Sequence, residues 1–362
     1  MNHTKRIRVL RGQMQEQGME AMLITHLPDV RYLCGFTGSN AALAVTAKSA
    51  AMFTDGRYTS QAKVETQGAR VVIAEKSALR EACAWLEKSG ATRAYFDPEH
   101  TTFFSLEIMR DMLSKGKRRS FFQPLKKPAV SELRMVKDAD ELLLMEKAAL
   151  LGCELFHAIL PHIQAGVPEQ EIAADLEFFA RSLGAEGMSF ETIVASGKRS
   201  AFPHGRASAA KVPARGFVTL DFGVILNGYC SDMTRTVHMG KPGQPEQFAY
   251  DAVLEAQEAA VAAVKPGATC GEVDEAARNV LRKAKLDKYF THSTGHGVGV
   301  EIHEPPRVAK EQEQKLQPGM VITIEPGVYI DGKFGIRIED MIAVTKSGGK
   351  ILTPSPKALI QL

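Results

Sequence analysis

Three histidines lie among three alternating glycines in the segment THSTGHGVGVEIHEPP, residues 291–306. His292 and His296 are four residues apart, as in the helical zinc motif H-E-x-x-H. A helix is disfavoured because each glycine would cost about 1 kcal/mol relative to alanine inside it. The glycines also miss the dinucleotide fingerprint G-x-G-x-x-G, because Val300 stands at its last position. The segment is therefore a loop or a closely packed strand, and its histidines are either ligands or merely polar side chains of a connection.

An acidic pair lies in the segment VTLDFGVILNGYCSDMTRTV, residues 218–237. Its Asn227-Gly228 dipeptide is a strong signal for a hairpin with a two-residue type I′ turn, which would place Asp221 opposite Thr234. Because side chains alternate along a strand, Asp221 and Asp232 would then share one face as diagonal neighbours, about 7 to 8 Å apart at the backbone. The two carboxylates can thus meet one cation, or else form a solvated surface pair.

A second acidic pair, Glu325 and Glu339, lies in VITIEPGVYIDGKFGIRIEDM, residues 321–341. Alternating apolar residues on both sides of Asp331-Gly332 predict two strands joined by a turn. A two-residue turn there would put the two glutamates on opposite faces of the hairpin. If they are to meet, the hairpin needs a bulge or an irregular loop, and Pro326-Gly327 is the natural place for it.

The two acidic pairs and one histidine would make a ligand set of oxygen and nitrogen without sulfur. Burying four carboxylates together is prohibitive unless cations neutralise them, and two divalent ions would do so. Carboxylates combined with imidazole suit manganese, cobalt, iron or zinc better than calcium, which takes oxygen ligands only. Two such ions can activate water and polarise a carbonyl group, so the predicted chemistry is hydrolytic.

The elements that must position these residues divide the chain in two. Up to residue 127, short β-like runs such as AMLIT and VVIAE alternate with helical runs such as ALREACAWLEKSG, which predicts an α/β domain. The stretch KGKRRSFFQPLKKPAV is basic, contains two prolines and precedes a long helical pattern. We therefore predict one domain over residues 1–127 and a second over residues 128–362.

The second domain contains a faint internal repeat at a shift of 101 residues. IQAGVPEQEIAADLEFFARSL, from residue 163, aligns with VKPGATCGEVDEAARNVLRKA, from residue 264. Gly166 then matches Gly267 and Arg181 matches Arg282, each within a glycine turn followed by an amphipathic helix. The shared order of elements predicts a duplicated half-domain in which each half offers one hairpin to a central site.

Composition excludes several classes of function. The chain has 362 residues, 45 basic against 42 acidic side chains and a net charge of +3, which is too balanced for a nucleic-acid surface. Its five cysteines are scattered and include no C-x-x-C pair, so neither a disulfide framework nor a thiolate zinc site is predicted. No signal peptide or membrane span is found. We expect a cytoplasmic protein.

The segments LDFGVILNGYCSDMTRT, TGHGVGVEIHEPP, TIEPGVY and GIRIED resemble, in order and spacing, the metal-site motifs of the pita-bread metallopeptidases. That family includes methionine aminopeptidase, aminopeptidase P, prolidase and the non-metal enzyme creatinase. The resemblance covers residues 130–362 and implies an α+β fold: a duplicated pita-bread domain preceded by the smaller α/β domain of the aminopeptidase P and prolidase branch. It assigns the ligands of two metal ions to Asp221, Asp232, His296, Glu325 and Glu339.

The resemblance also implies roles for five other residues. His303 lies where the family has a histidine that hydrogen-bonds the scissile amide, and His204, in SAFPHGR, matches a second histidine of the substrate pocket. His292 is either a pocket residue or a structural histidine. Arg337 would orient ligands or the substrate. Arg307, in HEPPRVAK, matches an arginine that in short prolidases approaches the proline carboxylate, a group that the guanidinium fork suits.

The implied activity is hydrolysis of the bond between an N-terminal residue and proline, and the proline preference comes from the resemblance alone. Glu325 would be the proton shuttle, and the metal ions with His303 would stabilise the oxyanion. We favour aminopeptidase P activity, because no segment of residues 1–127 can be identified as a lid over the pocket; an Xaa-Pro dipeptidase is the near alternative, towards which Arg307 points. A peptide-binding pseudoenzyme is disfavoured, since no ligand position is lost. We further expect manganese, with cobalt, zinc or iron as alternatives, a proline-containing peptide as substrate, and a homodimer.

Overall fold

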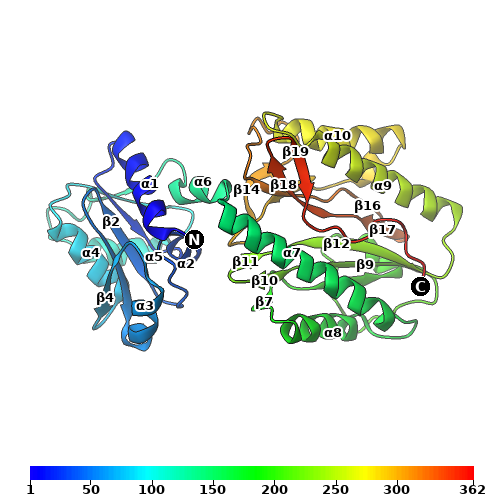
Figure 1. The fold of residues 1–362 in the computed structure, drawn as a ribbon, viewed down its shortest axis with the longest axis horizontal. Coiled ribbons are helices and arrows are strands. Elements are labelled where there is room, and N and C mark those ends of the chain that lie inside the picture. Colours follow the sequence, from blue (N-terminus) through cyan, green and yellow to red (C-terminus); the bar gives the residue numbers. More distant parts are fainter. The chain divides into compact units, whose positions relative to one another are not determined.

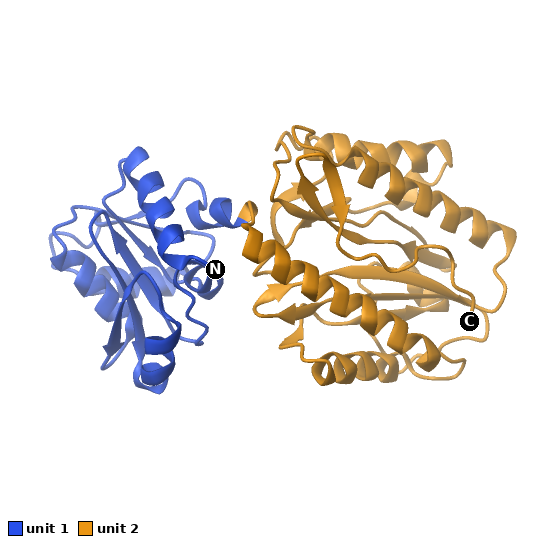
Figure 2. Ribbon diagram, viewed as in Figure 1, with its two compact units in different colours: residues 1–134 blue, residues 135–362 orange.

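The computed structural model describes residues 1–362 and divides into two compact units, residues 1–134 and 135–362 (Figure 2). The sequence places the boundary after residue 127, just before helix α6 (Ala129–Met135). Most of this helix belongs to the first unit, because its Arg134 forms a buried ion pair of 2.7 Å with Asp29. None of the helices combines the length and apolar character needed to cross a membrane.

Unit 1 is built on one six-stranded sheet with the strand order β4-β3-β2-β1-β5-β6. Strand β1 runs antiparallel to β2 and parallel to β5, as the predicted mixture of strands and helices allows. Alternate residues of β1 enter two hydrophobic clusters, Met22 and Ile24 on one face and Ala21 and Leu23 on the other. The sheet is therefore covered on both faces. Its elements are α1 (His3–Glu16), β1 (Ala21–Ile24), α2 (Leu27–Cys34), β2 (Ala42–Thr46), β3 (Ala50–Asp55), η1 (Gly56–Tyr58), α3 (Thr59–Glu65), β4 (Arg70–Ala74), α4 (Ala78–Lys88), β5 (Ala94–Phe96), α5 (Phe103–Asp111) and β6 (Phe122–Pro124).

The first half of unit 2 is a helix pair followed by antiparallel strands. Helices α7 and α8 pack with the strands around a cluster that includes Phe156, Leu176 and Leu220. A capping box at Asp138 and Glu141 fixes the start of α7. The elements are α7 (Ala139–Ile159), η2 (Leu160–His162), α8 (Glu169–Ser182), β7 (Gly187–Met188), β8 (Ile193–Ser196), η3 (Gly197–Ala201), β9 (Gly216–Phe222), β10 (Val224–Leu226), β11 (Tyr229–Cys230) and β12 (Met233–Met239).

The second half repeats this order around a cluster of its own, which includes Val253, Leu281 and Ile322. In Figure 1 the strands of unit 2 lie between the green helix α8 and the yellow helices α9 and α10. The elements are α9 (Gln244–Ala263), α10 (Cys270–Lys283), η4 (Asp287–Tyr289), β13 (Gly295–Gly297), β14 (Glu304–Val308), β15 (Val321–Ile324), β16 (Gly327–Ile330), β17 (Phe334–Arg337), β18 (Asp340–Thr345) and β19 (Gly348–Ile351).

The shift of 101 residues found in the sequence holds in the structure. Helices α8 and α10 begin at residues 169 and 270 and end at residues 182 and 283, a difference of 101 at both ends. Gly166 and Gly267 before them both adopt the left-handed conformation, with φ of 89° and 86°. The fold class predicted from the sequence, a duplicated pita-bread domain after a smaller α/β domain, is therefore the observed one.

Candidate metal centre

A cleft of about 800 Å³ lies in unit 2 between strands of its two halves. Every residue to which the sequence assigned a role in chemistry or binding lines this one cleft. They are Asp221, Asp232, His296, Glu325 and Glu339, proposed as metal ligands, and His204, His292, His303, Arg307 and Arg337. Since these residues span more than a hundred positions of the chain, the fold and not local sequence brings them together.

The first hairpin has the predicted register. Asn227 and Gly228 both have positive φ, 49° and 77°, as a type I′ turn requires. Strands β9 and β12 then pair Asp221 with Thr234. Asp221 and Asp232 consequently both face the cleft, where the Asp232 side chain is almost fully buried.

The second pair of carboxylates meets for a reason that differs from the predicted one. Strands β16 and β17 pair Ile330 with Phe334, so the turn has three residues, 331–333, instead of two. This register continues into β15 and β18, which pair Ile324 with Asp340. Glu325 therefore comes opposite Glu339 without any insertion at Pro326-Gly327. The predicted bulge is wrong, and the irregular loop is the turn itself.

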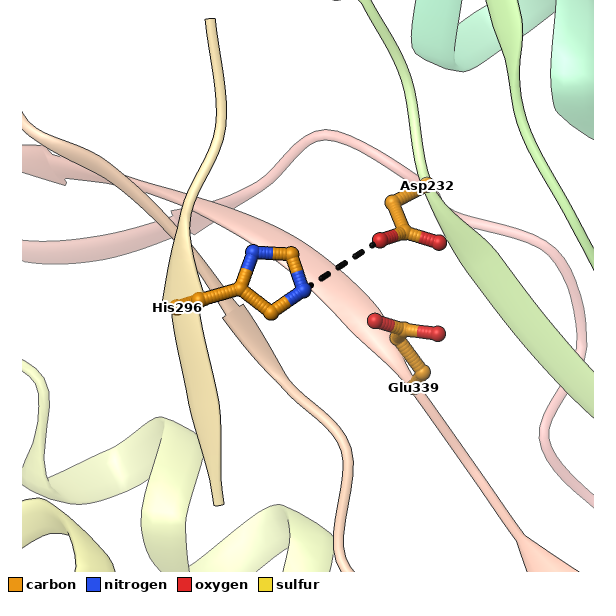
Figure 3. A group of neighbouring side chains, drawn as sticks. All are labelled: Asp232, His296 and Glu339. Atoms are coloured by element: carbon orange, nitrogen blue, oxygen red, sulfur yellow. Dashed lines mark ion pairs between the residues drawn. The ribbon is translucent and has the colours of Figure 1, made fainter. Parts of the chain in front are cut away.

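His296 is held by its neighbours so that one ring nitrogen faces the carboxylates. Its Nδ1 lies 3.0 Å from the carbonyl oxygen of Gly297, which can only accept, so the proton sits on Nδ1. Its Nε2 lies 3.6 Å from an oxygen of Asp232 and 3.6 Å from an oxygen of Glu325. Figure 3 shows the His296 ring pointing towards Asp232 and Glu339 from a separate strand. Ligand atoms of these three residues lie within 4.8 Å of one another.

The glycines beside His296 allow this close approach. A Cβ added to Gly295 would lie 1.9 Å from the carbonyl oxygen of Thr323, and one added to Gly297 would lie 2.2 Å from that of Pro305. Neither position tolerates a side chain without displacement of the backbone. The glycine alternation in the sequence is therefore a signature of strand packing around the ligand.

The carboxylates fit a bound cation. Buried oxygens of Asp221, Asp232 and Glu339 have no hydrogen-bond partner within the protein. Burial, followed by repulsion from the neighbouring carboxylates, holds the pKa values of Asp232 and Glu339 well above their ordinary range. Burial also raises the pKa of Glu325 to about 7. Divalent cations would neutralise these crowded carboxylates and coordinate the oxygens that have no hydrogen-bond partner. The combination of oxygen and imidazole donors suits a hard or borderline metal.

Arg337 positions Asp221. Its Nη2 donates to the Asp221 carboxylate at 2.5 Å, and its Nη1 donates to the Tyr329 hydroxyl at 2.6 Å and to the Pro203 carbonyl at 2.9 Å. The last bond also fixes the segment that carries His204, whose exposed side chain lines the cleft. The arginine is buried, so its guanidinium acts through these fixed partners rather than as a mobile surface charge.

His292 is held by the same network, because its Nε2 lies 3.0 Å from the Tyr329 hydroxyl and its Nδ1 lies 2.8 Å from the Ser293 carbonyl. Burial, helped by the charge of Arg337, lowers the pKa of His292 to about 4. The ring is therefore neutral at physiological pH. Tyr329 was not singled out in the sequence, although it lies on the same strand face as other polar residues of TIEPGVY, two positions beyond Gly327.

His303 and Arg307 lie on the cleft side of the segment that forms β14. Along residues 303–307 burial alternates: His303, Pro305 and Arg307 are exposed to the cleft, whereas Glu304 and Pro306 are buried. The His303 ring centroid lies 4.4 Å from that of His296. Arg307 is the residue directly opposite His296 across the β13 and β14 pair. Both side chains therefore border the proposed metal ligands.

Comparison with known proteins shows the family to which the chain belongs. Residues 143–346 match the model of metallopeptidase family M24, and residues 6–136 match the creatinase/prolidase N-terminal domain. The chain belongs to metallopeptidase family M24. Among solved structures it is similar to an Xaa-Pro dipeptidase from Bacillus anthracis, with 38% identity over 100% of both chains and a TM-score of 0.95.

Two further relatives of this M24 peptidase bear on its specificity. An Xaa-Pro dipeptidase of Pyrococcus horikoshii is 34% identical over 96% of both chains. The structure of an X-Pro aminopeptidase from Thermotoga maritima is 34% identical over 97% of this chain and 100% of that one, with a TM-score of 0.88. Both names thus occur among proteins of comparable similarity to this chain.

As a member of M24, the protein is a hydrolase that uses divalent metal ions, and the donor set of the cleft fits them. When bound, such ions polarise a carbonyl group and lower the pKa of water. The protein's own groups would hold the ions in place: Arg337 and Thr234 fix the orientation of Asp221 and Glu339, with the Thr234 hydroxyl donating to Glu339 at 2.7 Å.

Proposed function

We propose that the protein is an Xaa-Pro dipeptidase that binds two divalent ions, for which manganese is our first choice. The ligands of these ions would be Asp221, Asp232, His296, Glu325 and Glu339. The sequence alone favours aminopeptidase P. Two observations favour the dipeptidase: relatives over nearly the whole chain carry that name, and Arg307 stands opposite His296. The position of Arg307 carries the proposal.

Residues directly opposite each other in an antiparallel pair are about 4.5 to 5.5 Å apart at Cα. The Arg307 side chain extends from such a position next to His296 into the cleft, and it forms no ion pair with an acidic side chain of the protein. In an Xaa-Pro dipeptide the free carboxylate follows the scissile amide by a single residue. If the scissile amide lies at the metal ligands, the carboxylate of the proline residue would come within reach of the Arg307 guanidinium on the neighbouring strand. A guanidinium binds such a carboxylate in bidentate geometry.

The remaining side chains supply proton transfer and orientation. Glu325, which the resemblance makes the proton shuttle, would accept a proton from water and pass it to the leaving amine. His303, exposed in the cleft beside His296, would hydrogen-bond the substrate at the reacting amide. His204 and His292 would line the pocket around it.

Aminopeptidase P activity remains the second candidate because the cleft is wide. Its volume of about 800 Å³ exceeds what a dipeptide needs, and a close relative is named an X-Pro aminopeptidase. A longer peptide has no carboxylate near Arg307, so the two activities differ in their dependence on this residue.

The deciding experiment compares an Xaa-Pro dipeptide with the same peptide extended by two residues. We expect kcat/KM to be at least about tenfold higher for the dipeptide, and Arg307→Ala to erase the advantage, as loss of a charged hydrogen bond would. Arg206→Ala is the matched control, since Arg206 also lines the cleft but forms an ion pair of 2.8 Å with Glu191. Equal or better hydrolysis of the extended peptide by the unaltered enzyme would assign aminopeptidase P activity instead.

A further inference from the structure

The loop that connects β13 to β14 carries His303, and the carboxylate of Glu304 lies underneath it. Glu304 Oε1 accepts a hydrogen bond of 3.1 Å from the backbone N–H of Glu301, and so closes the end of the loop. A Cβ added to Gly299 would lie only 2.4 Å from an oxygen of the same carboxylate. The carboxylate therefore packs directly against the loop backbone at both of these residues.

A lysine far away in the chain holds this carboxylate. Lys137 Nζ lies 3.1 Å from Glu304 Oε2, and both side chains are almost completely buried, with exposed fractions of 1% and 3%. The Lys137 backbone is itself fixed, because its N–H donates to the Gly319 carbonyl at 2.9 Å. Gly319 has a positive φ of 96°, and a Cβ there would lie 2.9 Å from the Lys137 carbonyl oxygen. The ammonium group thus projects from a rigid point next to α7.

We propose that Lys137 and Glu304 form a positioning pair that sets the place of His303 in the cleft. The inference deepens the proposed function, on which it rests. His303 directly precedes Glu304, and its side chain is exposed and lines the cleft, whereas the carboxylate of Glu304 is buried against the loop. A displacement of the inward carboxylate is therefore passed to the histidine by one peptide unit.

A simple contribution to stability is the competing explanation, because removing one partner of a buried ion pair is strongly destabilising wherever the pair lies. The two explanations differ in what they predict for catalysis. A positioning pair acts through His303, so its loss lowers kcat and leaves KM and metal binding nearly unchanged. A pair that only stabilises the fold changes the melting temperature and leaves kcat of the folded enzyme alone.

The first test is Lys137→Met, which keeps the length and the apolar stem of the side chain. We expect kcat for an Xaa-Pro dipeptide to fall by about tenfold to a hundredfold, as for a catalytic group displaced by about 1 Å. Lys137→Arg should recover part of the loss. Leu176→Ala is the control for stability, because this fully buried leucine of α8 lies outside the cleft; its melting temperature should fall while kcat is retained.

The second test places Lys137→Met in a His303→Ala background. If Lys137 acts through His303, the lysine substitution should lower kcat by less than about threefold once the histidine is gone. An equal factor in both backgrounds, or an unchanged kcat in the single variant, overturns the proposal. Should Lys137→Met fail to fold, Glu304→Gln is measured in the same cycle, since its amide oxygen can still accept from Glu301.

Two readouts do not depend on activity. Calorimetric titration of the metal-free protein with manganese should give the same stoichiometry for Lys137→Met and for the unaltered chain, and a loss of binding overturns the proposal. The ring signal of His303, assigned by its disappearance in His303→Ala, should shift in the nuclear magnetic resonance spectrum of Lys137→Met. Were the unaltered protein inactive on all proline peptides, the proposed function would fail, whereas an unmoved His303 signal would remove the positioning pair alone.

Discussion

Two of the four proposed ligand carboxylates, those of Asp221 and Glu339, have one oxygen fixed by the protein and another left open. Thr234 donates to Glu339 Oε2 while Glu339 Oε1 has no partner, and Arg337 donates to Asp221 Oδ2 while Asp221 Oδ1 has none. Such half-satisfied carboxylates are costly in a folded protein, but they are what a cation requires of its ligands. We therefore expect the hydroxyl of Thr234 to support metal binding by orienting Glu339, without itself being a ligand.

We predict that Thr234→Val will weaken metal binding by about tenfold to a hundredfold, because Glu339 loses the hydrogen bond that orients it. The side chain keeps its shape, so the strand pairing of β9 and β12 should persist. Binding is measured by calorimetric titration of the metal-free protein. Thr219→Val is the control: this hydroxyl bonds Thr236 at 3.1 Å on the same strand pair and touches no carboxylate. Equal affinities of the two variants would contradict the role given to Thr234.

At the scale of elements, the two hairpins show how far the sequence could go. Asn227-Gly228 demands positive φ at both positions, so local chemistry fixed the register that brings Asp221 and Asp232 together. Asp331-Gly332 is compatible with two- and three-residue loops, and local chemistry leaves the choice open. Tertiary contacts hold β17 in the observed place: the N–H of Gly335 donates to the Ser200 hydroxyl at 2.8 Å, a partner 135 residues away.

The same distinction applies to other parts of the site. The histidines, glycines and carboxylates of the short motifs could be identified in the sequence. The repeat that places α8 and α10 at equivalent positions in the two halves could be identified as well. The support that Lys137 gives to Glu304 was not visible, because the two residues are separated by 167 positions and neither belongs to a periodic pattern that would link them. Long-range ion pairs of this kind follow from the packed structure only.

We predict that deleting Lys333 will leave metal binding and turnover largely intact. The deletion shortens the turn to the two residues Asp331-Gly332, across which Ile330 can still pair with Phe334, so Glu325 stays opposite Glu339. Deleting Ile336 instead removes a residue between the turn and Glu339, which turns the two glutamates to opposite faces and should abolish metal binding. Metal content is measured by elemental analysis of the purified variants together with dipeptide hydrolysis. An Ile336 deletion variant that keeps full metal content would mean that the strand register does not bring the two glutamates together.

At the scale of the whole molecule, the buried carboxylates of the site couple folding to the binding of protons. Asp232, Glu325 and Glu339 all have raised pKa values in the metal-free protein, with burial as the first cause. Between the ordinary and the raised pKa values, the folded chain therefore holds protons that the unfolded chain has already released. Ligands must lose these protons to bind a metal, so metal binding, protonation and folding are linked.

This linkage gives a prediction for stability against pH. For Glu325 the pKa rises from 4.5 to about 7 on folding, so metal-free protein binds more protons when folded throughout that window and loses stability as the pH rises through it. His292, with a pKa of about 4 instead of 6.5, acts in the opposite sense, and so do His296 and His303, whose pKa values burial also lowers. These three histidines cost stability as the pH falls below 6.5. Above pH 6.5 these histidines contribute little and the carboxylates dominate, so we expect the melting temperature of metal-free protein to fall by several degrees between pH 6.5 and pH 8. The manganese-loaded protein should show little change over the same range, since its ligands stay ionised.

Calorimetry of the metal-free and the manganese-loaded protein measures this difference in pH dependence. Metal-free Glu325→Gln should show a weaker dependence of the melting temperature on pH than the unaltered chain. Parallel pH profiles of the metal-free and metal-loaded protein would contradict the coupling between these carboxylates and the metal ions.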